Sequence, residues 1–424
     1  MRSSADSMDT EPLCLPVVPE VGVVAFVPDH FDCPWQPRHQ VMTRLARYFH
    51  VVWMEPPPGW REVVASWVTD RSNGKDPANP HRGLGRPPPA SMVVHDPGRT
   101  LPHVYRPRFV GEFTARARAR SALRLLREKG CTQVALYLWR PGFEDELDRI
   151  PHQVSCYHVD DDYSFSPEER CTSPQELRVL RRVDQVFIHS PALIEKKGGV
   201  NPNTDFIPNG VDYESFATPA PEPSDLVGIP HPRIGYTGFL KKQLDWSLLL
   251  DLAQRHPEWS FVFVGPRHAH PEIQEPIRLL ETRKNVHFLG GKPAGQLGAY
   301  VQHFDASILP YVVDDYTRYI NPLKLYEYLA AGPPIVGTPI RTLKEFTTAV
   351  QLASGVEEWS DALDHALRHA DTAPQGRAAR RKIARRYDWN HLVHGIARAV
   401  AAQLDDGAVD RIDTVTPESF ASVP

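Results

Sequence analysis

The alternation of apolar runs and helix-like stretches after Arg233 constrains the fold of this chain most strongly. A helical pattern such as 244–256, with its apolar positions on one face, separates apolar runs that are short enough to be buried strands. This alternation is typical of parallel strands joined by helical crossovers, whose ligands bind beyond the carboxyl ends of the strands. The strand candidates are Ile234–Gly238, Phe261–Gly265, Val286–Gly290, Ala306–Pro310, Ile335–Thr338 and Val350–Ala353.

The N-terminal half repeats this pattern less regularly, so we expect an α/β protein with two Rossmann-like, doubly wound domains and a cleft between them. Its strand candidates are Val21–Val27, Val51–Met54, Val134–Trp139, Val154–Val159 and Val186–His189. The expected order is a disordered N-terminus (1–19), a first domain (20–216), a Pro-rich linker (217–232), a second domain (233–386), a crossover helix (387–404) and a disordered tail (405–424).

Composition excludes several classes of protein. The 424 residues are 41% apolar and 24% charged, which is a globular composition. No apolar run approaches the ~18 residues of a membrane span, and the N-terminus does not resemble a signal peptide. The net charge of −4 gives no global basic field for nucleic acid, so we expect no nucleic-acid partner. The five scattered cysteines, with no pair at metal-ligand spacing, favour a reducing cytoplasm.

The segment Asn321–Pro334 predicts a helix that holds an anion at its start. Asn321 is a candidate cap, Pro322 suits the first helical position, and the segment reaches Gly332 before two prolines. The amides of Leu323 and Lys324 would point out of the helix N-terminus, where the macrodipole and the Lys324 ammonium favour a phosphate.

Glu327 lies one turn further along the same face as Lys324, at a spacing of about 5–6 Å. A carboxylate there can accept hydrogen bonds from two hydroxyls, so the pair fits a diphosphate followed by a ribose. The alternative is a helix capped for stability alone, with Glu327 as a solvated charge.

This segment resembles the donor-binding signature of GT-B glycosyltransferases, particularly retaining, family-4-like enzymes that use nucleotide-diphosphate sugars. The likeness extends over roughly 21–400. It includes the Asn-Gly-Val-Asp turn in 206–212 and a terminal helix after 387–389 that crosses back onto the first domain. It implies transfer of a sugar to a glycan, lipid-linked or small-molecule acceptor, with retention, in polysaccharide biosynthesis. The location would be cytoplasmic, or peripheral at the inner face of the membrane.

Transfer of this kind requires stabilisation of the growing charge on the leaving diphosphate. Lys324, the helix amides and the turn at Gly238 with Lys241 are the candidates, so we expect no metal ion and no other cofactor. The resemblance places a basic pair after this strand. Phe239 and Leu240 follow Gly238 here, which leaves Lys241 and Lys242 as ligands or as solvated loop charges.

Family members often carry a glutamate eight positions before the ribose ligand, in contact with the transferred sugar. That position is Tyr319 here. Arg318, Asp314 and Asp315 lie in the same loop and are the replacement candidates, with Arg318 assigned to the donor. A plain solvated loop accounts for them equally well.

On the opposite wall, His158 and the following Asp160, Asp161 and Asp162 close a strand candidate. The resemblance implies a histidine or acidic residue here near acceptor and sugar, so His158 is a catalytic candidate and Asp161 and Asp162 are acceptor candidates. Adjacent side chains of an extended segment point alternately, so the three carboxylates cannot all face one Mg²⁺. A helix cap or a salt-bridge cluster is the alternative.

The loop after the first strand lacks the glycines that the family often has there. Arg38 and His39 are our acceptor candidates in this loop, and Arg38 alternatively only starts a helix. Elsewhere, Arg116, Arg120, Arg124 and Arg127 follow helical spacing. The resemblance implies membrane contact for such a basic face, and an ordinary solvated face above a leucine-lined core is the alternative.

Four other functions fit the same architecture to different degrees. A nucleotide-sugar epimerase or a phosphorylase shares the fold, and a non-catalytic GT-B scaffold in polysaccharide assembly is consistent with Tyr319 and the glycine-free loop. A dehydrogenase fits less well, because no G-x-G-x-x-G opens either half.

Overall fold

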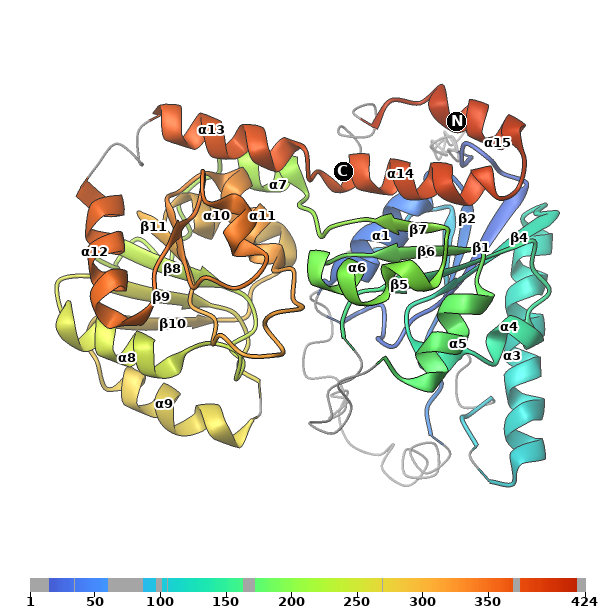
Figure 1. The fold of residues 1–424 in the computed structure, drawn as a ribbon, viewed down its shortest axis with the longest axis horizontal. Helices are drawn as coiled ribbons and strands as arrows, with labels where there is room; N and C mark the ends of the chain where they lie inside the picture. Colours follow the sequence, from blue (N-terminus) through green and yellow to red (C-terminus); the bar gives the residue numbers. More distant parts are fainter. Residues whose placement is uncertain are drawn as a thin grey trace, which may run out of the picture.

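The computed structural model describes residues 15–33, 35–59, 87–96, 101–104, 106–162, 172–268, 270–368 and 374–417. Its two parallel sheets lie in two halves of the molecule, each covered by helices (Figure 1). The predicted α/β class with two doubly wound sheets is confirmed. Among the described residues, no helix combines the length and the apolar character needed to cross a membrane.

The first sheet has the strand order β3-β2-β1-β4-β5-β6-β7. Strand β1 lies at its centre and pairs in parallel with β2 and β4, with Gly22 opposite His50 and Val134. The strands are β1 (Val21–Phe26), β2 (His50–Met54), β3 (Met92–His95), β4 (Gln133–Leu138), β5 (Val154–Val159), β6 (Gln185–Ile188) and β7 (Thr204–Phe206). The sequence patterns missed β3 and β7, which are short edge strands with partly exposed residues.

The second sheet has the order β10-β9-β8-β11-β12-β13. All six predicted strands of this half are present within a residue or two of their expected ends, and all their pairings are parallel. The residues of the inner strands β9, β8, β11 and β12 are all buried, as expected for a parallel sheet that is covered on both faces. The strands are β8 (Arg233–Thr237), β9 (Ser260–Val264), β10 (Val286–Gly290), β11 (Ala306–Leu309), β12 (Ile335–Gly337) and β13 (Gln351–Leu352).

The helices of the first half are α1 (Pro37–Leu45), α3 (Arg108–Glu128), α4 (Glu146–Arg149), α5 (Pro174–Arg182) and α6 (Pro191–Lys197). Those that follow are α7 (Tyr213–Ala217), α8 (Trp246–Arg255), α9 (Pro271–Glu281), α10 (Leu297–Gln302), α11 (Leu323–Ala331), α12 (Gly355–Arg368), α13 (Pro374–Arg385), α14 (Trp389–Ala402) and α15 (Asp406–Asp413).

The chain passes between the halves twice, at neighbouring places. Val211 donates its amide to the Tyr387 carbonyl, and the Trp389 amide donates to the Val211 carbonyl, at 2.9 and 3.0 Å. After this crossing α14 lies on the first half, where Val393 and Ile396 are fully buried in its core (Figure 1).

Three terminal or connecting segments differ from what we expected. The tail at 405–424 is not wholly disordered, because α15 begins after Asp405, whose side chain caps it, and buries Ile412 against the first half. Val18 of the supposed disordered N-terminus is also buried, and residues 1–14 lie outside the described part. In the presumed linker, Leu226 and Ile229 pack into the second core.

Candidate functional site

Helix α11 begins in the cleft as predicted, but its N-terminus is built differently. Pro322, rather than Asn321, occupies the cap position, and no side chain caps the helix. The prediction that Asn321 caps α11 is therefore wrong. Its side-chain oxygen, the atom that a cap would use, accepts from the Tyr326 hydroxyl at 2.9 Å, and its Nδ2 donates to the His189 carbonyl at 2.6 Å. The amides of Leu323 and Lys324 remain in the first turn, where helix geometry gives them no intrahelical acceptor.

Lys324 passes directly over Gly238 at the end of β8. A Cβ atom added to Gly238 would lie 2.2 Å from Lys324 Cε and 2.7 Å from Nζ. Gly238 also has a φ of 123°, which L side chains rarely adopt, and its amide donates to the Val264 carbonyl at 2.8 Å. Glycine is thus required at position 238 both by the backbone conformation of the turn and by the close approach of Lys324. Gly238 and Lys324, two predicted donor-binding residues, therefore lie in contact.

Lys241 lies in the same corner as Lys324. Burial and the Lys324 charge lower the pKa of Lys241 to about 8, while Asp161 of the first half opposes that shift. Two ammonium groups therefore share one corner of the cleft at the start of α11, which is an arrangement suited to a strongly anionic ligand. The neighbouring Lys242 is exposed.

Glu327 is partly buried one turn into α11. Burial raises the pKa of its carboxyl, and the Lys324 charge acts in the opposite direction. Glu327 and Leu323 line a cavity between the two halves, together with Trp35, Gln36, Gln40, Gly210, Val211, Asp212, Ser215, Phe216, Ala294, Leu297 and Trp389. The ribose candidate therefore faces side chains of both domains.

The loop before α11 is turned towards the first half. Arg318 is exposed, and its guanidinium carbon lies 5.8 Å from the centroid of the Tyr319 ring. On the first half, Lys196 Nζ lies 4.8 Å from the centroid of the same ring. Tyr319 thus packs across the domain boundary. Asp314 and Asp315 are exposed, and Asp314 caps the local turn by accepting from the Thr317 amide at 2.7 Å.

The three aspartates after β5 have three different environments. Asp160 is held by Arg38 and Arg140, at 3.0 and 2.6 Å, and Asp162 by Lys196 and Lys197, at 2.7 and 3.1 Å. These two match the salt-bridge alternative. Asp161 is partly exposed; burial and the neighbouring Asp160 charge raise its pKa to about 6, while Lys241 lowers it.

The candidate histidines are both buried. The Tyr137 hydroxyl lies 2.8 Å from His158 Nδ1, Trp139 stacks on the ring at 4.2 Å, and burial lowers the pKa of His158 to about 3. His39 accepts from the Gln36 amide at 3.1 Å, and burial with the Arg38 charge lowers its pKa to about 4. Both imidazoles are neutral at physiological pH.

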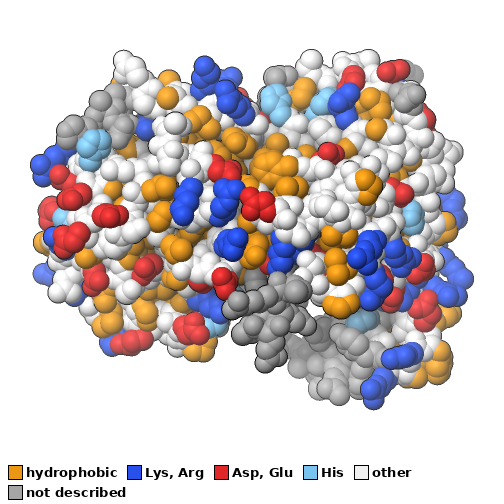
Figure 2. Space-filling view, viewed as in Figure 1, with side chains coloured by type: hydrophobic (Ala, Val, Ile, Leu, Met, Phe, Trp, Pro, Cys, Tyr) orange, Lys and Arg blue, Asp and Glu red, His pale blue; other side chains and the backbone are white. Residues whose placement is uncertain are grey.

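Two residues of this region were missed. Arg140 holds Asp160 in an ion pair, and Tyr316 lies near Asp161: burial raises the pKa of its phenol, and the Asp161 charge adds to that shift. Both stand in irregular segments, where no periodicity could have indicated them. Figure 2 shows acidic and basic side chains meeting along the boundary between the halves.

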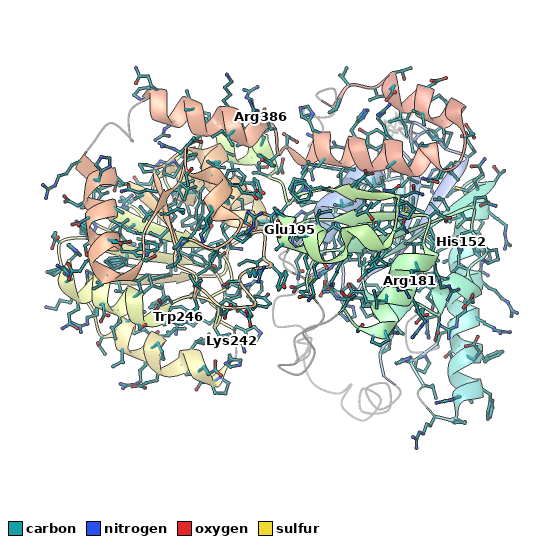
Figure 3. All side chains as sticks on the ribbon, in the orientation of Figure 1. His152, Arg181, Glu195, Lys242, Trp246 and Arg386 are labelled. Carbon is teal, nitrogen blue, oxygen red and sulfur yellow. The ribbon has the colours of Figure 1, made fainter. Side chains whose placement is uncertain are left out.

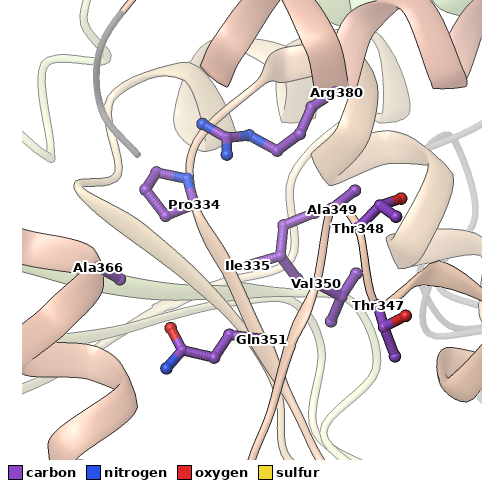
Figure 4. A pocket seen from close by; sticks show the side chains of 9 residues that line it. All are labelled: Pro334, Ile335, Thr347, Thr348, Ala349, Val350, Gln351, Ala366 and Arg380. Carbon is purple, nitrogen blue, oxygen red and sulfur yellow. The ribbon is translucent and has the colours of Figure 1, made fainter. Parts of the chain in front are cut away.

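Within the described part of the chain, no group of three or more His, Cys, Asp or Glu side chains is arranged to hold a metal ion. The absence of a metal requirement stays a prediction. A separate pocket of about 220 Å³ lies away from the cleft, at the amino ends of β12 and β13 (Figure 4). Arg380 lines it, and none of the predicted site residues does.

Comparison with known proteins gives matches to both halves. Residues 231–369 match a family described as Glycosyl transferases group 1. TuaH of Bacillus subtilis (strain 168), which bears the name of a teichuronic acid biosynthesis glycosyltransferase, is 31% identical over 245 residues. That match covers 54% of this chain and 59% of TuaH, so the chain spans less than two thirds of this relative.

Among solved structures, Anabaena HepE in complex with UDP and glucose has a TM-score of 0.61 at 16% identity, covering 90% of this chain and 99% of HepE. An E. coli structure with bound UDP-2-fluoro glucose has a TM-score of 0.61 at 14% identity, covering 89% and 98%. The α,α-trehalose 6-phosphate synthase of Burkholderia multivorans has a TM-score of 0.60 at 14% identity, covering 94% and 99%. At these identities, the likeness concerns the fold.

Proposed function

We propose that this chain, a GT-B protein with a group 1 glycosyl transferase domain at 231–369, moves a sugar from a nucleotide-diphosphate sugar to a carbohydrate or lipid-linked acceptor. One observation carries the proposal. Lys241 and Lys324 share the corner at the N-terminus of α11, and Glu327 follows one turn later. This order of charges matches a diphosphate followed by a ribose.

In this mechanism the lysines act on the leaving group. As the glycosidic bond breaks, negative charge builds up on the diphosphate, and the ammonium groups of Lys324 and Lys241 stabilise it together with the α11 amides. Because these groups are already in place and partly desolvated, they need little reorganisation during the reaction.

The acceptor would approach from the first half. Asp160 and Asp162 are held by arginines and lysines, whereas Asp161 is partly exposed and faces Lys241. We assign hydroxyl binding to Asp161. Since the pKa of His158 is about 3, this imidazole is a poor general base near neutral pH. A donor phosphate that accepts the acceptor proton, with retention at the sugar, is consistent with these environments.

The enclosed space beside Glu327 is small, about 50 Å³, whereas pockets for ligands of this size have volumes of about 300–1,000 Å³. A nucleotide sugar would therefore enter after the two halves move apart. Their later closure would exclude the water that competes with the acceptor.

A nucleotide-sugar panel tests this function. Purified protein is incubated with UDP-, GDP- and ADP-sugars, with and without glycan acceptors, and released nucleotide diphosphate is measured. We expect release with one nucleotide class and a loss of about 10²-fold in kcat for Lys324→Ala. Lys242→Ala, an exposed lysine outside the cleft, is the matched control.

The alternatives give other results in the same panel. A scaffold would bind a nucleotide without releasing it from any sugar, an epimerase would convert the donor without acceptor, and a phosphorylase would require inorganic phosphate. No binding and no turnover with any donor would contradict the proposal.

A second proposal concerns α3 and an anionic lipid surface. Phe109 and Phe113 are 75% and 67% exposed, and at helical spacing they continue into the exposed Arg116, Arg120 and Arg124. An interfacial helix inserts exposed aromatic side chains into the lipid surface and binds anionic headgroups with its basic side chains. A helix face that contacts only water gains nothing from two exposed phenylalanines.

Vesicle sedimentation tests this contact. We expect binding to vesicles that contain phosphatidylglycerol, weak binding to pure phosphatidylcholine, and loss of binding in the double variant Phe109→Ala/Phe113→Ala. Leu279→Ala, at an exposed leucine of α9, is the control for loss of surface apolar area. Equal sedimentation of the parent and the double variant would contradict it.

A further inference from the structure

Asn321 joins the donor helix to the other half of the molecule. Its side-chain Nδ2 donates to the His189 carbonyl at 2.6 Å, and its Oδ1 accepts from the Tyr326 hydroxyl at 2.9 Å. Its backbone carbonyl accepts from Asn209 Nδ2, also at 2.6 Å. Asn321 is only 4% exposed, so these polar groups would be costly to leave unpaired.

The bonds of Asn321 continue to the wall that carries Asp161. His189 follows β6, and its Nδ1 donates to the carbonyl of Val159, the last residue of β5, at 2.9 Å. Since a carbonyl only accepts, the neutral imidazole must carry its proton on Nδ1. An unbroken path therefore runs from the end of β5 through His189 and Asn321 to the first turn of α11.

Asn321 also lies close to the two places where the chain crosses between the halves. Asn209 belongs to the first of the two chain crossings and stands two residues before Val211, which pairs with the second crossing. Asn321 thus lies beside the place where both crossings meet. Further from it, Arg341 Nη2 contacts Glu195 Oε1 at 2.9 Å, at the boundary of the halves (Figure 3).

We propose that Asn321 is a positioning residue that fixes the donor-binding turn of α11 relative to the acceptor wall at the end of β5. The inference rests on the proposed function. In the closed state Asn321 holds Lys324 and Asp161 at a set separation, so that the acceptor hydroxyl meets the sugar when both substrates are bound. Asn321 itself touches neither reacting atom, because its side-chain polar groups already have protein partners.

This role separates transfer from donor binding. The groups that we assign to the diphosphate and the ribose, namely the α11 amides, Lys241, Lys324 and Glu327, all belong to the second half, so they stay together when the link to His189 is lost. The distance from these groups to the acceptor wall is no longer fixed in that case. A small error in the relative placement of the reactants lowers the reaction rate strongly. Asn321→Ala should therefore lower kcat at least tenfold while the Kd for the nucleoside diphosphate changes less than about threefold.

Asn285 provides the matched control. It is an asparagine of the second half whose Nδ2 donates to the carbonyls of Ala253, His256 and Trp259, at 3.0, 3.0 and 3.1 Å. All of these partners lie within one domain. Asn285→Ala therefore removes comparable hydrogen bonds without touching the boundary, and it should lower the Tm with little change in kcat.

The experiment measures kcat, nucleoside diphosphate Kd, Tm and the radius of gyration by small-angle X-ray scattering for the parent, Asn321→Ala, Asn321→Asp and Asn285→Ala. Asn321→Asp is isosteric but cannot donate to the His189 carbonyl, so it should reproduce the loss in kcat. We expect both Asn321 variants to show a larger radius of gyration than the parent, and Asn285→Ala to match the parent.

Two results would overturn the inference: a kcat for Asn321→Ala within twofold of the Asn285→Ala value, or a loss of kcat explained wholly by weaker donor binding. If the parent releases no nucleotide from any donor, the proposed function fails, and scattering alone decides about Asn321. An unchanged radius of gyration in both Asn321 variants would then exclude its positioning role.

Discussion

At the scale of single residues, Glu327 offers a partly buried carboxylate: burial raises its pKa, and the Lys324 ammonium opposes that shift. If it accepts two ribose hydroxyls, Glu327→Ala should weaken nucleoside diphosphate binding by about 1–3 kcal/mol, because charged hydrogen bonds of this kind are lost. Titration calorimetry with the nucleotide that binds the parent measures this. Glu272→Ala, on the exposed start of α9, is the control. Unchanged affinity in folded Glu327→Ala would remove this residue from the site.

The lowered pKa of Lys241 should make donor binding depend on pH. Its pKa is lowered to about 8 in the empty cleft, so it loses its proton as the pH rises through 8. A bound diphosphate favours the charged form, so binding takes up a proton above that pH. Donor affinity should fall by up to about tenfold per pH unit there, since one proton is linked to binding.

Lys241→Arg provides the test of this pH dependence, because a guanidinium stays protonated throughout. Its nucleoside diphosphate affinity should be nearly constant between pH 7 and about 9. Calorimetry in buffers of different ionisation enthalpy reports the proton uptake directly. A parent whose affinity is the same on both sides of pH 8 would show that Lys241 does not contact the diphosphate.

The two lysines also bear on metal dependence. They place positive charge where a divalent ion would otherwise act, so we expect turnover to survive dialysis against EDTA. Asp161 is the residue that challenges this expectation. Loss of turnover on chelation, its recovery with Mg²⁺ or Mn²⁺, and the absence of that recovery in Asp161→Asn would together show a metal-dependent reaction.

At the scale of elements, α11 is stabilised from its far end. Its last carbonyls, Ala330 and Ala331, accept from Arg381 of α13 at 3.1 and 3.2 Å, and the Gly332 carbonyl accepts from Arg380 at 3.0 Å. Cations at a helix C-terminus complement its dipole and satisfy carbonyls that the helix leaves open. The end that faces the ligand is thus kept free of side-chain caps, and the opposite end is held by guanidinium groups.

Arg381→Ala tests this support of α11. We expect the free energy of unfolding to fall by about 1–3 kcal/mol, because two charged hydrogen bonds to the helix end are lost. Chemical denaturation measures it, and Lys382→Ala, an exposed neighbour on α13, should change it by less than about 0.5 kcal/mol. Equal stability of the two variants would mean that packing alone fixes α11.

The sequence predicted these elements better than it predicted their connections. Buried strands such as β5 and β8 carry runs of apolar residues, and Gly332 ends α11 with a φ of 95° as its position indicated. Asn321 was read as a cap because its residue type is typical of caps. Its partner His189 lies 132 positions away, and such a contact leaves no trace in local spacing.

The cleft shows the same limit at single positions. Lys324, Glu327 and Gly238 were identified because a helix start and a strand end impose their spacing. Arg140 and Tyr316 lie in irregular segments, which have no periodic pattern, so the sequence did not indicate them as site residues. His158 was chosen because the resemblance implies a histidine or an acidic residue at this strand end. Burial against Trp139, which only the folded chain shows, makes its imidazole neutral.

At the scale of the whole molecule, the last helices belong to the first domain although they follow the second in sequence. α14 packs on α1, and Trp389, Val393 and Ile396 complete the core beneath β1 and β2. The first domain therefore lacks part of its core until α14 has been synthesised. This arrangement also explains why two crossings, rather than one, connect the halves.

Ile396→Ala should consequently destabilise the first domain from a position near the C-terminus. Its side chain is 0% exposed, so the cavity should lower the free energy of unfolding by about 2–5 kcal/mol. Hydrogen exchange should then rise in β1 and β2 before it rises in β8 and β9. Gly395→Ala is the control on the same helix: its added methyl meets no atom within 4 Å, and it should be neutral or stabilise by up to about 1 kcal/mol. Faster exchange first in β8 and β9 would show that α14 supports the second domain instead.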